Sequence, residues 1–147
     1  MEIEVAAENS SFAQHRAIIK HIIVWMCDQL SLAVQNINVI FTNDFHIRKI
    51  HKDYFNDDTP TDVITFNLGT ADHIDAEIYI SAERATEQAV QYKVSELQEA
   101  CRLIVHALLH LAGFNDKSDP ERQRMRKEEN KFVGLISDRF LANNISN

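Results

Sequence analysis

Residues 101–116 read CRLIVHALLHLAGFND, an almost continuous apolar run in which two histidines stand out. Ahead of this run, Ser95 and Gln98 have the spacing of a capping box, and behind it Gly113 suits the left-handed residue that ends many helices. The spacing therefore predicts a helix from about residue 95 to Ala112. Because nearly all sides of this helix are apolar, we expect it in the core of a globular domain.

Four segments outside this helix predict β-strands. Apolar residues recur at every second position in Ile3–Ala7, Asn36–Thr42 and Ile74–Ile80. The β-branched run from Asp62 to Phe66 follows a polar loop at residues 56–60. It predicts a short strand, which we expect in the centre of the sheet.

Helical spacing of apolar residues predicts four further helices, each beginning next to residues that commonly cap helix N-termini. Residues 9–11 provide such caps for the first, and Ser118-Asp119-Pro120-Glu121 combines a cap, a first-turn proline and an acid for the last. The predicted helices run from Phe12 to Leu30, from Asn43 or Asp44 through Tyr54, from Ser81 to about Gln91, and over about twenty residues from Ser118.

Four strands interspersed with five helices predict an α+β fold with one four-stranded sheet, mostly parallel or mixed. The length of 147 residues, with 45% hydrophobic and 25% charged residues, suits one domain covering residues 1–147.

The sequence favours a cytoplasmic protein with no membrane partner. Its longest apolar stretches fall short of the ~20 residues that a membrane span needs, and the acidic, alternating start from Met1 to Val5 is unlike a signal peptide. Cys27 and Cys101 lie within apolar helical patterns, so we expect buried thiols rather than a disulfide framework.

Fifteen basic and twenty-two acidic residues give a formal charge of −7, which disfavours general binding to polyanions. Contact with a nucleic acid would therefore need a local basic patch, and Arg122, Arg124 and Arg126 form one candidate. Acidic residues are interleaved with these arginines, so a solvated helix face with ion pairs is the alternative interpretation.

His106 and His110 are one helical turn apart, which places both imidazoles on one face of the predicted helix. Gly113 can end the helix and turn the chain back, so that Asp116 reaches the same point. Two imidazoles and one carboxylate suffice to bind one zinc ion and leave a fourth position open. The alternative is that each histidine satisfies a core carbonyl group and Asp116 is a surface acid.

This spacing is that of the metzincin zinc helix, His-Glu-x-x-His-x-x-Gly-x-x-His, with two differences. Ala107 replaces the glutamate that serves such peptidases as general base, and Asp116 replaces the third histidine. Without the glutamate, the group that deprotonates the attacking water is missing, which makes a metallopeptidase the second choice.

Two motifs resemble the YbeY-type rRNA maturation factors, which are zinc-dependent, single-strand-specific endoribonucleases of bacteria. The family pattern His-Gly-x-Leu-His-Leu-x-Gly-Tyr-Asp-His is similar to residues 106–116, and Thr-Asp-Val-Leu-Ser-Phe is similar to residues 61–66. The length and the order of the elements also agree, so that the resemblance covers most of the chain.

The chain departs from this family pattern at several positions. Asp116 replaces a histidine, Ala107 replaces a glycine, and Ala76-Glu77 stands where Gly-Asp usually opens the fourth strand. Phe55 takes the place of an arginine thought to act on RNA. Arg48, Lys49 and Lys52 on the preceding helix could supply charge instead, although a solvated face is their ordinary role.

The resemblance implies a zinc-dependent endoribonuclease that matures the 3′ end of small-subunit rRNA and acts in ribosome quality control. Its partners would be rRNA and ribosomal particles, with no DNA expected. His106, His110 and Asp116 would bind the metal, which would polarise a phosphoryl oxygen or activate water. Asp62 and Glu77 are weak candidates for a catalytic base, because the strands that carry them could border the site.

A ribosome-assembly protein with a purely structural metal is a third possibility. Structural zinc sites usually have four protein ligands, and only three are apparent here. Asn115 or Asp119 could supply the fourth ligand. The sequence does not determine the oligomeric state.

Overall fold

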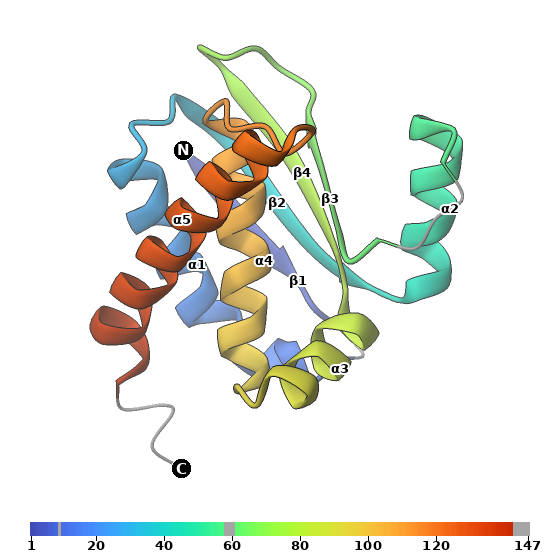
Figure 1. The fold of residues 1–147 in the computed structure, drawn as a ribbon, viewed down its shortest axis with the longest axis vertical. Coiled ribbons are helices and arrows are strands. Elements are labelled where there is room, and N and C mark those ends of the chain that lie inside the picture. The colour runs from blue at the N-terminus through green and yellow to red at the C-terminus, as the bar shows by residue number, and fades with distance from the viewer. Residues whose placement is uncertain (9, 58–60, 143–147) are drawn as a thin grey trace.

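The computed structural model describes residues 1–8, 10–57 and 61–142, which form a four-stranded sheet and five α-helices (Figure 1). The strands are β1 (Glu2–Ala6), β2 (Val34–Thr42), β3 (Val63–Asn67) and β4 (Ile74–Ser81). The helices are α1 (Arg16–Gln29), α2 (Asp44–Phe55), α3 (Ala82–Tyr92), α4 (Glu96–Leu111) and α5 (Asp119–Ile136). A 3₁₀ turn (Ser11–His15) precedes α1, and a π-helical turn (Ser137–Leu141) follows α5.

The predicted α+β class, the mixed sheet and the five helices are confirmed. The first predicted helix differs at its start, because Ser10 caps the 3₁₀ turn and the α-helix begins only at Arg16. Asn9 and part of the predicted loop at residues 56–60 lie outside the described residues.

The strand order is β1-β2-β4-β3, with β1, β2 and β4 parallel and β3 antiparallel to β4. The prediction that the strand at residues 62–66 is central is therefore wrong, since β3 lies at an edge of the sheet. Its β-branched residues instead suit a strand that is contacted by a helix on each face. The helices α4 and α2 both contact β3, and Ile64 is buried even though one edge of the strand has no neighbouring strand among the described residues.

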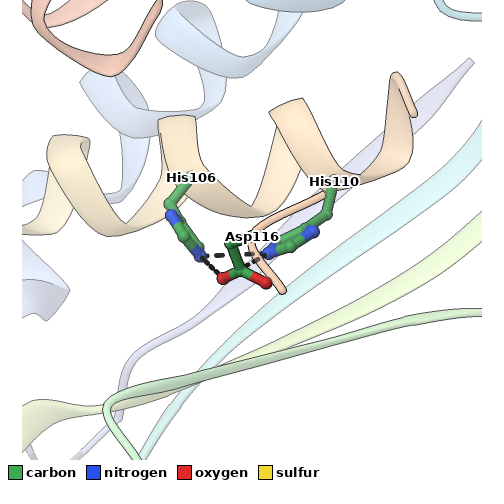
Figure 2. Close-up of side chains that lie close together, drawn as sticks. All are labelled: His106, His110 and Asp116. Atoms are coloured by element: carbon green, nitrogen blue, oxygen red, sulfur yellow. Dashed lines mark hydrogen bonds and ion pairs between the residues drawn. The ribbon is translucent and has the colours of Figure 1, made fainter. Parts of the chain in front are cut away.

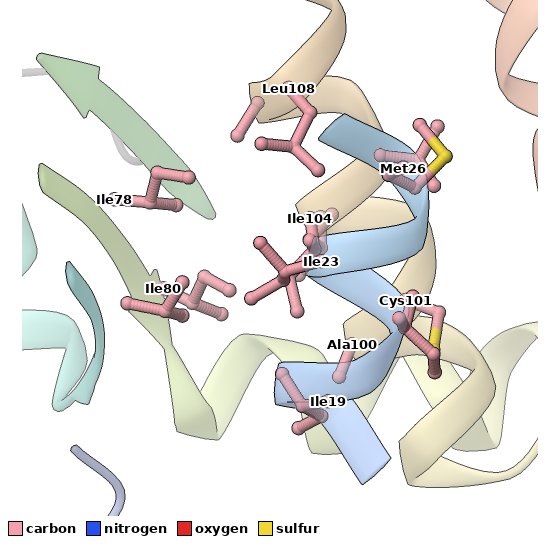
Figure 3. Packing of buried hydrophobic residues seen from close by; sticks show 14 of the residues in the cluster. Ile19, Ile23, Met26, Ile78, Ile80, Ala100, Cys101, Ile104 and Leu108 are labelled. Carbon is pink, nitrogen blue, oxygen red and sulfur yellow. The ribbon is translucent and has the colours of Figure 1, made fainter. Parts of the chain in front are cut away.

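The core lies between one face of the sheet and the helices α1 and α4. Ile78 and Ile80 of β4 pack toward Ile23 of α1 and toward Ile104 and Leu108 of α4 (Figure 3). These side chains are fully buried, and α4 contributes more buried residues than any other described helix. The apolar run at residues 101–112 is therefore the centre of the core, as its pattern predicts.

Both cysteines are free and buried in this core, as expected from their apolar surroundings. Burial raises the pKa of the Cys101 thiol to about 12 and that of Cys27 to about 11, so both thiols remain protonated and unreactive near neutral pH.

The two faces of β4 differ because successive side chains of a strand point to opposite sides. Ile78 and Ile80 face the core, whereas Glu77 and Tyr79 face the other side, where Phe66 of β3 and the helix α2 lie. Figure 1 shows α2 across the sheet from α1, α4 and α5. The open edge of β3 thus lies between α2 and α4.

The predicted caps form as their sequences suggest. Ser95 and Gln98 make both hydrogen bonds of a capping box at the start of α4, and Ser118 and Glu121 do the same for α5. Gly113 adopts a φ of 100° just after α4, a backbone conformation that residues other than glycine rarely adopt. None of the helices in the described ranges is long and apolar enough to cross a membrane.

Candidate metal centre

The last two turns of α4 carry His106 and His110 on the side of the helix away from the core (Figure 2). The residues between them are buried, which fixes the rotation of the helix and points both imidazoles to one place. The two Nε2 atoms lie 3.1 Å apart. The side chains of His106 and His110 are 24% and 30% exposed, so solvent reaches both rings.

The turn at Gly113 brings the third side chain to this point. Backbone amides of Gly113 and Phe114 donate to the carbonyls of His110 and Leu109, which closes the end of the helix and reverses the chain. Asp116 then faces the imidazoles, with its Oδ2 atom 3.5 Å from Nε2 of His106 and 3.4 Å from Nε2 of His110.

The first turn of α5 holds this loop in place. Nη1 of Arg122 donates to the backbone carbonyls of Asp116, at 3.2 Å, and of Lys117, at 3.1 Å. The guanidinium of Arg122 also pairs with Asp119, one of the two residues considered as a fourth ligand. Asn115, the other, is exposed and lines a separate small cavity beside Arg124.

His106, His110 and Asp116 form a group that could hold a metal ion, because one ligand atom from each lies within 4.8 Å of the others. No other such group of three occurs among the residues that the structure describes. Two imidazoles and a carboxylate are donors that suit a borderline divalent cation.

Glu129 of α5 completes the arrangement and was missed by the sequence analysis. Its Oε2 atom lies 2.7 Å from Nδ1 of His106, and since an ionised carboxylate can only accept, Nδ1 carries the proton and donates it. This bond leaves Nε2 of His106 as the lone-pair atom that faces His110 and Asp116. Metal-binding histidines commonly have such a carboxylate behind them.

The surroundings of His106 act on its pKa in opposite directions. Burial lowers the pKa, whereas the hydrogen bond to Glu129 and the charges of Glu129, Asp116 and Asp62 raise it. The net result is a raised pKa, because the carboxylates outweigh the cost of burying a charged imidazole. Three carboxylates around one histidine also make this spot favourable for a cation.

The three side chains open into a cavity of about 570 Å³ at the free edge of β3. Helix α4 provides one wall, β3 the floor and α2 the opposite wall. The lining residues outside the metal group are His51, Phe55, Thr61, Asp62, Val63, Ile64, Thr65, Asn67 and Leu111. A larger groove of about 900 Å³ along α1 shares no lining residue with this cavity and contains none of the three side chains.

The structure separates the two candidate bases. Asp62 lines the cavity, and its Oδ2 atom accepts a hydrogen bond of 3.1 Å from Gln88 of α3. Glu77 is absent from the described lining of the cavity and accepts a hydrogen bond from Tyr79 on the opposite face of the sheet. The expectation that both strands border the site therefore holds only for the strand of Asp62.

The predicted basic residues divide into two groups, one on α2 and one on α5. Arg48, Lys49 and Lys52 are exposed on α2, the helix that forms the wall opposite the histidines. Arg124 and Arg126 are exposed on α5, where Arg122 also holds the Asp116 loop.

The sequence is similar to those of known proteins of one family. The family model described as "Endoribonuclease YbeY" matches residues 2–136. An "Endoribonuclease YbeY" of Flavobacterium psychrophilum is 42% identical over 100 residues, covering 68% of this chain and 71% of the relative. One of Chlorobium phaeobacteroides is 30% identical over 117 residues, covering 80% and 82%.

The fold is also similar to a solved structure, the solution structure of TM1509 from Thermotoga maritima. The TM-score is 0.67 at 22% identity, and the match covers 98% of this chain and 94% of that one. With the family match spanning β1 to α5 and the motif histidines gathered with Asp116 at an open cavity, the chain belongs to the endoribonuclease YbeY family.

Proposed function

We propose that the protein is a metal-dependent endoribonuclease that cuts single-stranded RNA. The observation that carries this proposal is the convergence of His106, His110 and Asp116 at the wall of an open cavity. Three protein ligands leave room for a substrate oxygen in the coordination sphere. Membership of the endoribonuclease YbeY family supports RNA as the substrate.

Zinc is the proposed metal, with one ion per chain. In a tetrahedral site with bonds of about 2.0–2.1 Å, pairs of ligand atoms lie about 3.3–3.4 Å apart. The Nε2–Nε2 distance of 3.1 Å and the two Nε2–Oδ2 distances of 3.5 and 3.4 Å are close to this requirement. The mixed nitrogen and oxygen donors, without a thiolate, also suit zinc.

The residues around the metal would have distinct roles. His106, His110 and Asp116 would bind the ion, which when bound supplies Lewis-acid activation for phosphodiester hydrolysis. Glu129 would orient His106 through the bond to Nδ1. Asp62, held by Gln88 at the cavity wall, is the proposed general base, because it is a carboxylate that lines the same cavity as the metal ligands.

We further propose that the biological substrate is rRNA, with maturation of the small-subunit 3′ end and ribosome quality control as the process and the cytoplasm as the location. The family resemblance supports this assignment. Exposed basic residues on α2, the helix that lines the cavity, and on α5 support a polyanionic substrate, despite the net charge of −7.

Two other functions fit this site less well. A metallopeptidase would need a general base next to the metal, and Ala107 occupies the position of the glutamate in that motif. A purely structural metal would be enclosed by four protein ligands, whereas this group of three faces a cavity. Both observations favour hydrolysis of RNA.

The test is cleavage of a labelled single-stranded RNA by the purified protein, alongside elemental analysis. We expect about one zinc per chain, cleavage that a chelator abolishes and zinc restores, and no cleavage of a peptide. Asp62→Asn should keep the metal and lose most of the activity. The exposed Asp72→Asn should retain both, as a control for the removed charge. Full cleavage after complete removal of metal would refute the proposal.

A further inference from the structure

Helix α2 and strand β3 carry a cluster of aromatic rings that the catalytic proposal does not use. Phe55 stacks on Phe66 with ring centroids 5.6 Å apart and an interplanar angle of 23°. Tyr54 packs edge-on against the same ring at 5.4 Å. We call Tyr54, Phe55 and Phe66 the aromatic platform.

Two rings of the platform are unusually exposed. Tyr54 is 73% exposed and Phe55 is 50% exposed, although both have a neighbouring ring on one side. Exposed apolar groups of this size, clustered rather than scattered, are typical of binding surfaces. Phe66 behind them is half-buried and fixes the position of the outer rings.

The platform is continuous with the metal cavity. Phe55 and His51 are both lining residues of the cavity that contains His106, His110 and Asp116. The ring of His51 lies 5.4 Å from that of Phe55. A chain bound across the metal would therefore reach the platform within the same cavity.

Basic residues on α2 indicate the chemistry of the occupant. His51 and Phe55 line the cavity, so the mean of their two directions around the axis of α2 is the direction of the cavity. With about 100° of rotation per residue, Arg48 lies about 40° from this mean direction. Lys52 lies about 80° from the same direction. Cationic groups beside exposed rings suit a ligand with phosphates and flat bases, since single strands bind through both contacts.

We propose that the aromatic platform stacks an unpaired base of the RNA, next to the phosphate that lies at the metal. This inference rests on the proposed function and deepens it, because it assigns single-strand selectivity to Phe55 and Tyr54. A base in a duplex is already stacked on its neighbours and has no free face for the rings, whereas a splayed base does. An apolar segment of a partner protein is the competing occupant.

The experiment measures binding of a short phosphorothioate oligoribonucleotide that carries the fluorescent base 2-aminopurine. The protein is used as purified, and a gel confirms that the oligonucleotide stays intact. Stacking on the platform should quench the fluorescence. Phe55→Leu should weaken binding about tenfold or more and remove most of the quenching, because a base stacked on an aromatic side chain gives an affinity gain of this size.

Phe45→Leu is the matched control. Phe45 lies near the other end of the same helix, is 81% exposed and does not line the cavity. Its replacement should change neither affinity nor quenching. Phe55→Trp should preserve both, which separates stacking from a general effect on folding. The wild type should bind an oligonucleotide with an abasic site more weakly than the intact oligonucleotide. Phe55→Leu should bind the two oligonucleotides equally.

The outcomes separate the platform from catalysis. Quenching that depends on Phe55 supports the platform even when unmodified RNA is not cut, in which case the proposed function fails. Cleavage of unmodified RNA with equal binding by wild type and Phe55→Leu overturns the platform and leaves the proposed function standing. Equal losses of affinity in Phe45→Leu and Phe55→Leu also overturn the platform. So does equal binding of the abasic and the intact oligonucleotide by the wild type, and that result favours a protein occupant.

Discussion

Nδ1 of His106 donates a 2.7 Å hydrogen bond to Oε2 of Glu129, so that a residue of α5 determines which nitrogen of α4 faces the metal position. Glu129 is the least exposed member of the arrangement, with its side chain 14% exposed. Nη1 of Arg102 lies 3.7 Å from its other oxygen, Oε1, so Glu129 has a cationic neighbour from α4 as well as the imidazole. The proposed metal centre therefore depends on the packing of two helices.

Glu129→Gln should weaken zinc binding about tenfold to a hundredfold, since loss of the partner behind a metal-binding histidine has effects of this size. The amide can still accept from Nδ1 but no longer makes the imidazole more basic. A competition titration with a chromophoric zinc chelator measures the change. The control is Glu128→Gln, one residue earlier and paired with Lys131 instead. Equal affinities for both variants would contradict the proposed role of Glu129.

Asp116→Ala should release most of the zinc, because two imidazoles remain as protein ligands, while Asp116→His should retain it, because imidazole is a competent zinc ligand. His110→Ala should behave like Asp116→Ala, since it too removes one of three ligands. Elemental analysis after dialysis gives the stoichiometries. Unchanged zinc in Asp116→Ala would show that this carboxylate is not a ligand.

Arg122→Ala should weaken metal binding without touching a ligand, because Arg122 holds the carbonyls of Asp116 and Lys117. We expect the zinc affinity to fall several-fold, which corresponds to the contribution of about 1 kcal/mol that an ordinary hydrogen bond makes. Arg124→Ala, two residues further along α5, removes the same charge and should leave zinc affinity unchanged. Comparable losses in both variants would indicate an electrostatic effect rather than positioning of the loop.

Replacing Arg48 or Lys52 with glutamate should weaken RNA binding and lower its salt dependence more than the same change at Lys49. The three residues share a helix, but Lys49 lies about 140° from the direction of the cavity, whereas Arg48 lies about 40° from it. Each lost phosphate contact lowers the slope of log K against log salt by about 0.7 for a single strand. Equal slopes for all three variants would remove α2 from the RNA-binding surface.

The sequence predicts those features that depend on local spacing. The capping box at Ser95, the helix that it opens, the paired histidines and the turn at Gly113 are all encoded within about twenty consecutive residues, where one helical period determines which side chains meet. This local geometry also brings Asp116 to the histidines.

Features that depend on how elements pack could not be found in the same way. In the sequence, Glu129 is one of several charged residues on the last helix and lies twenty-three residues from its partner His106. Only the packing of α5 against α4 brings the two side chains together. The edge position of β3 depends on strand order, which a β-branched run does not specify. The sequence makes Glu77 a candidate because its strand could border the site, but the alternation along β4 places it on the face opposite the core, where it bonds to Tyr79.

Buried Glu99 should make the protein less stable as the pH rises from about 4.5 to about 7. Burial raises its pKa from 4.5 to about 7, with Asp62 and Glu129 raising it further and Arg102 opposing them. The folded state therefore holds a proton that the unfolded state has lost, so stability falls across this range, by about 3 kcal/mol in total.

Glu99→Gln keeps a neutral side chain at every pH, so its free energy of unfolding should exceed that of the wild type by about this amount at pH ~8 and match it near pH ~4. Urea denaturation at a series of pH values measures the difference, in which contributions from other groups, including His106, largely cancel. The exposed Glu87→Gln serves as the control and should parallel the wild type. A constant offset between Glu99→Gln and the wild type across the whole range would show that Glu99 is ionised in the folded protein.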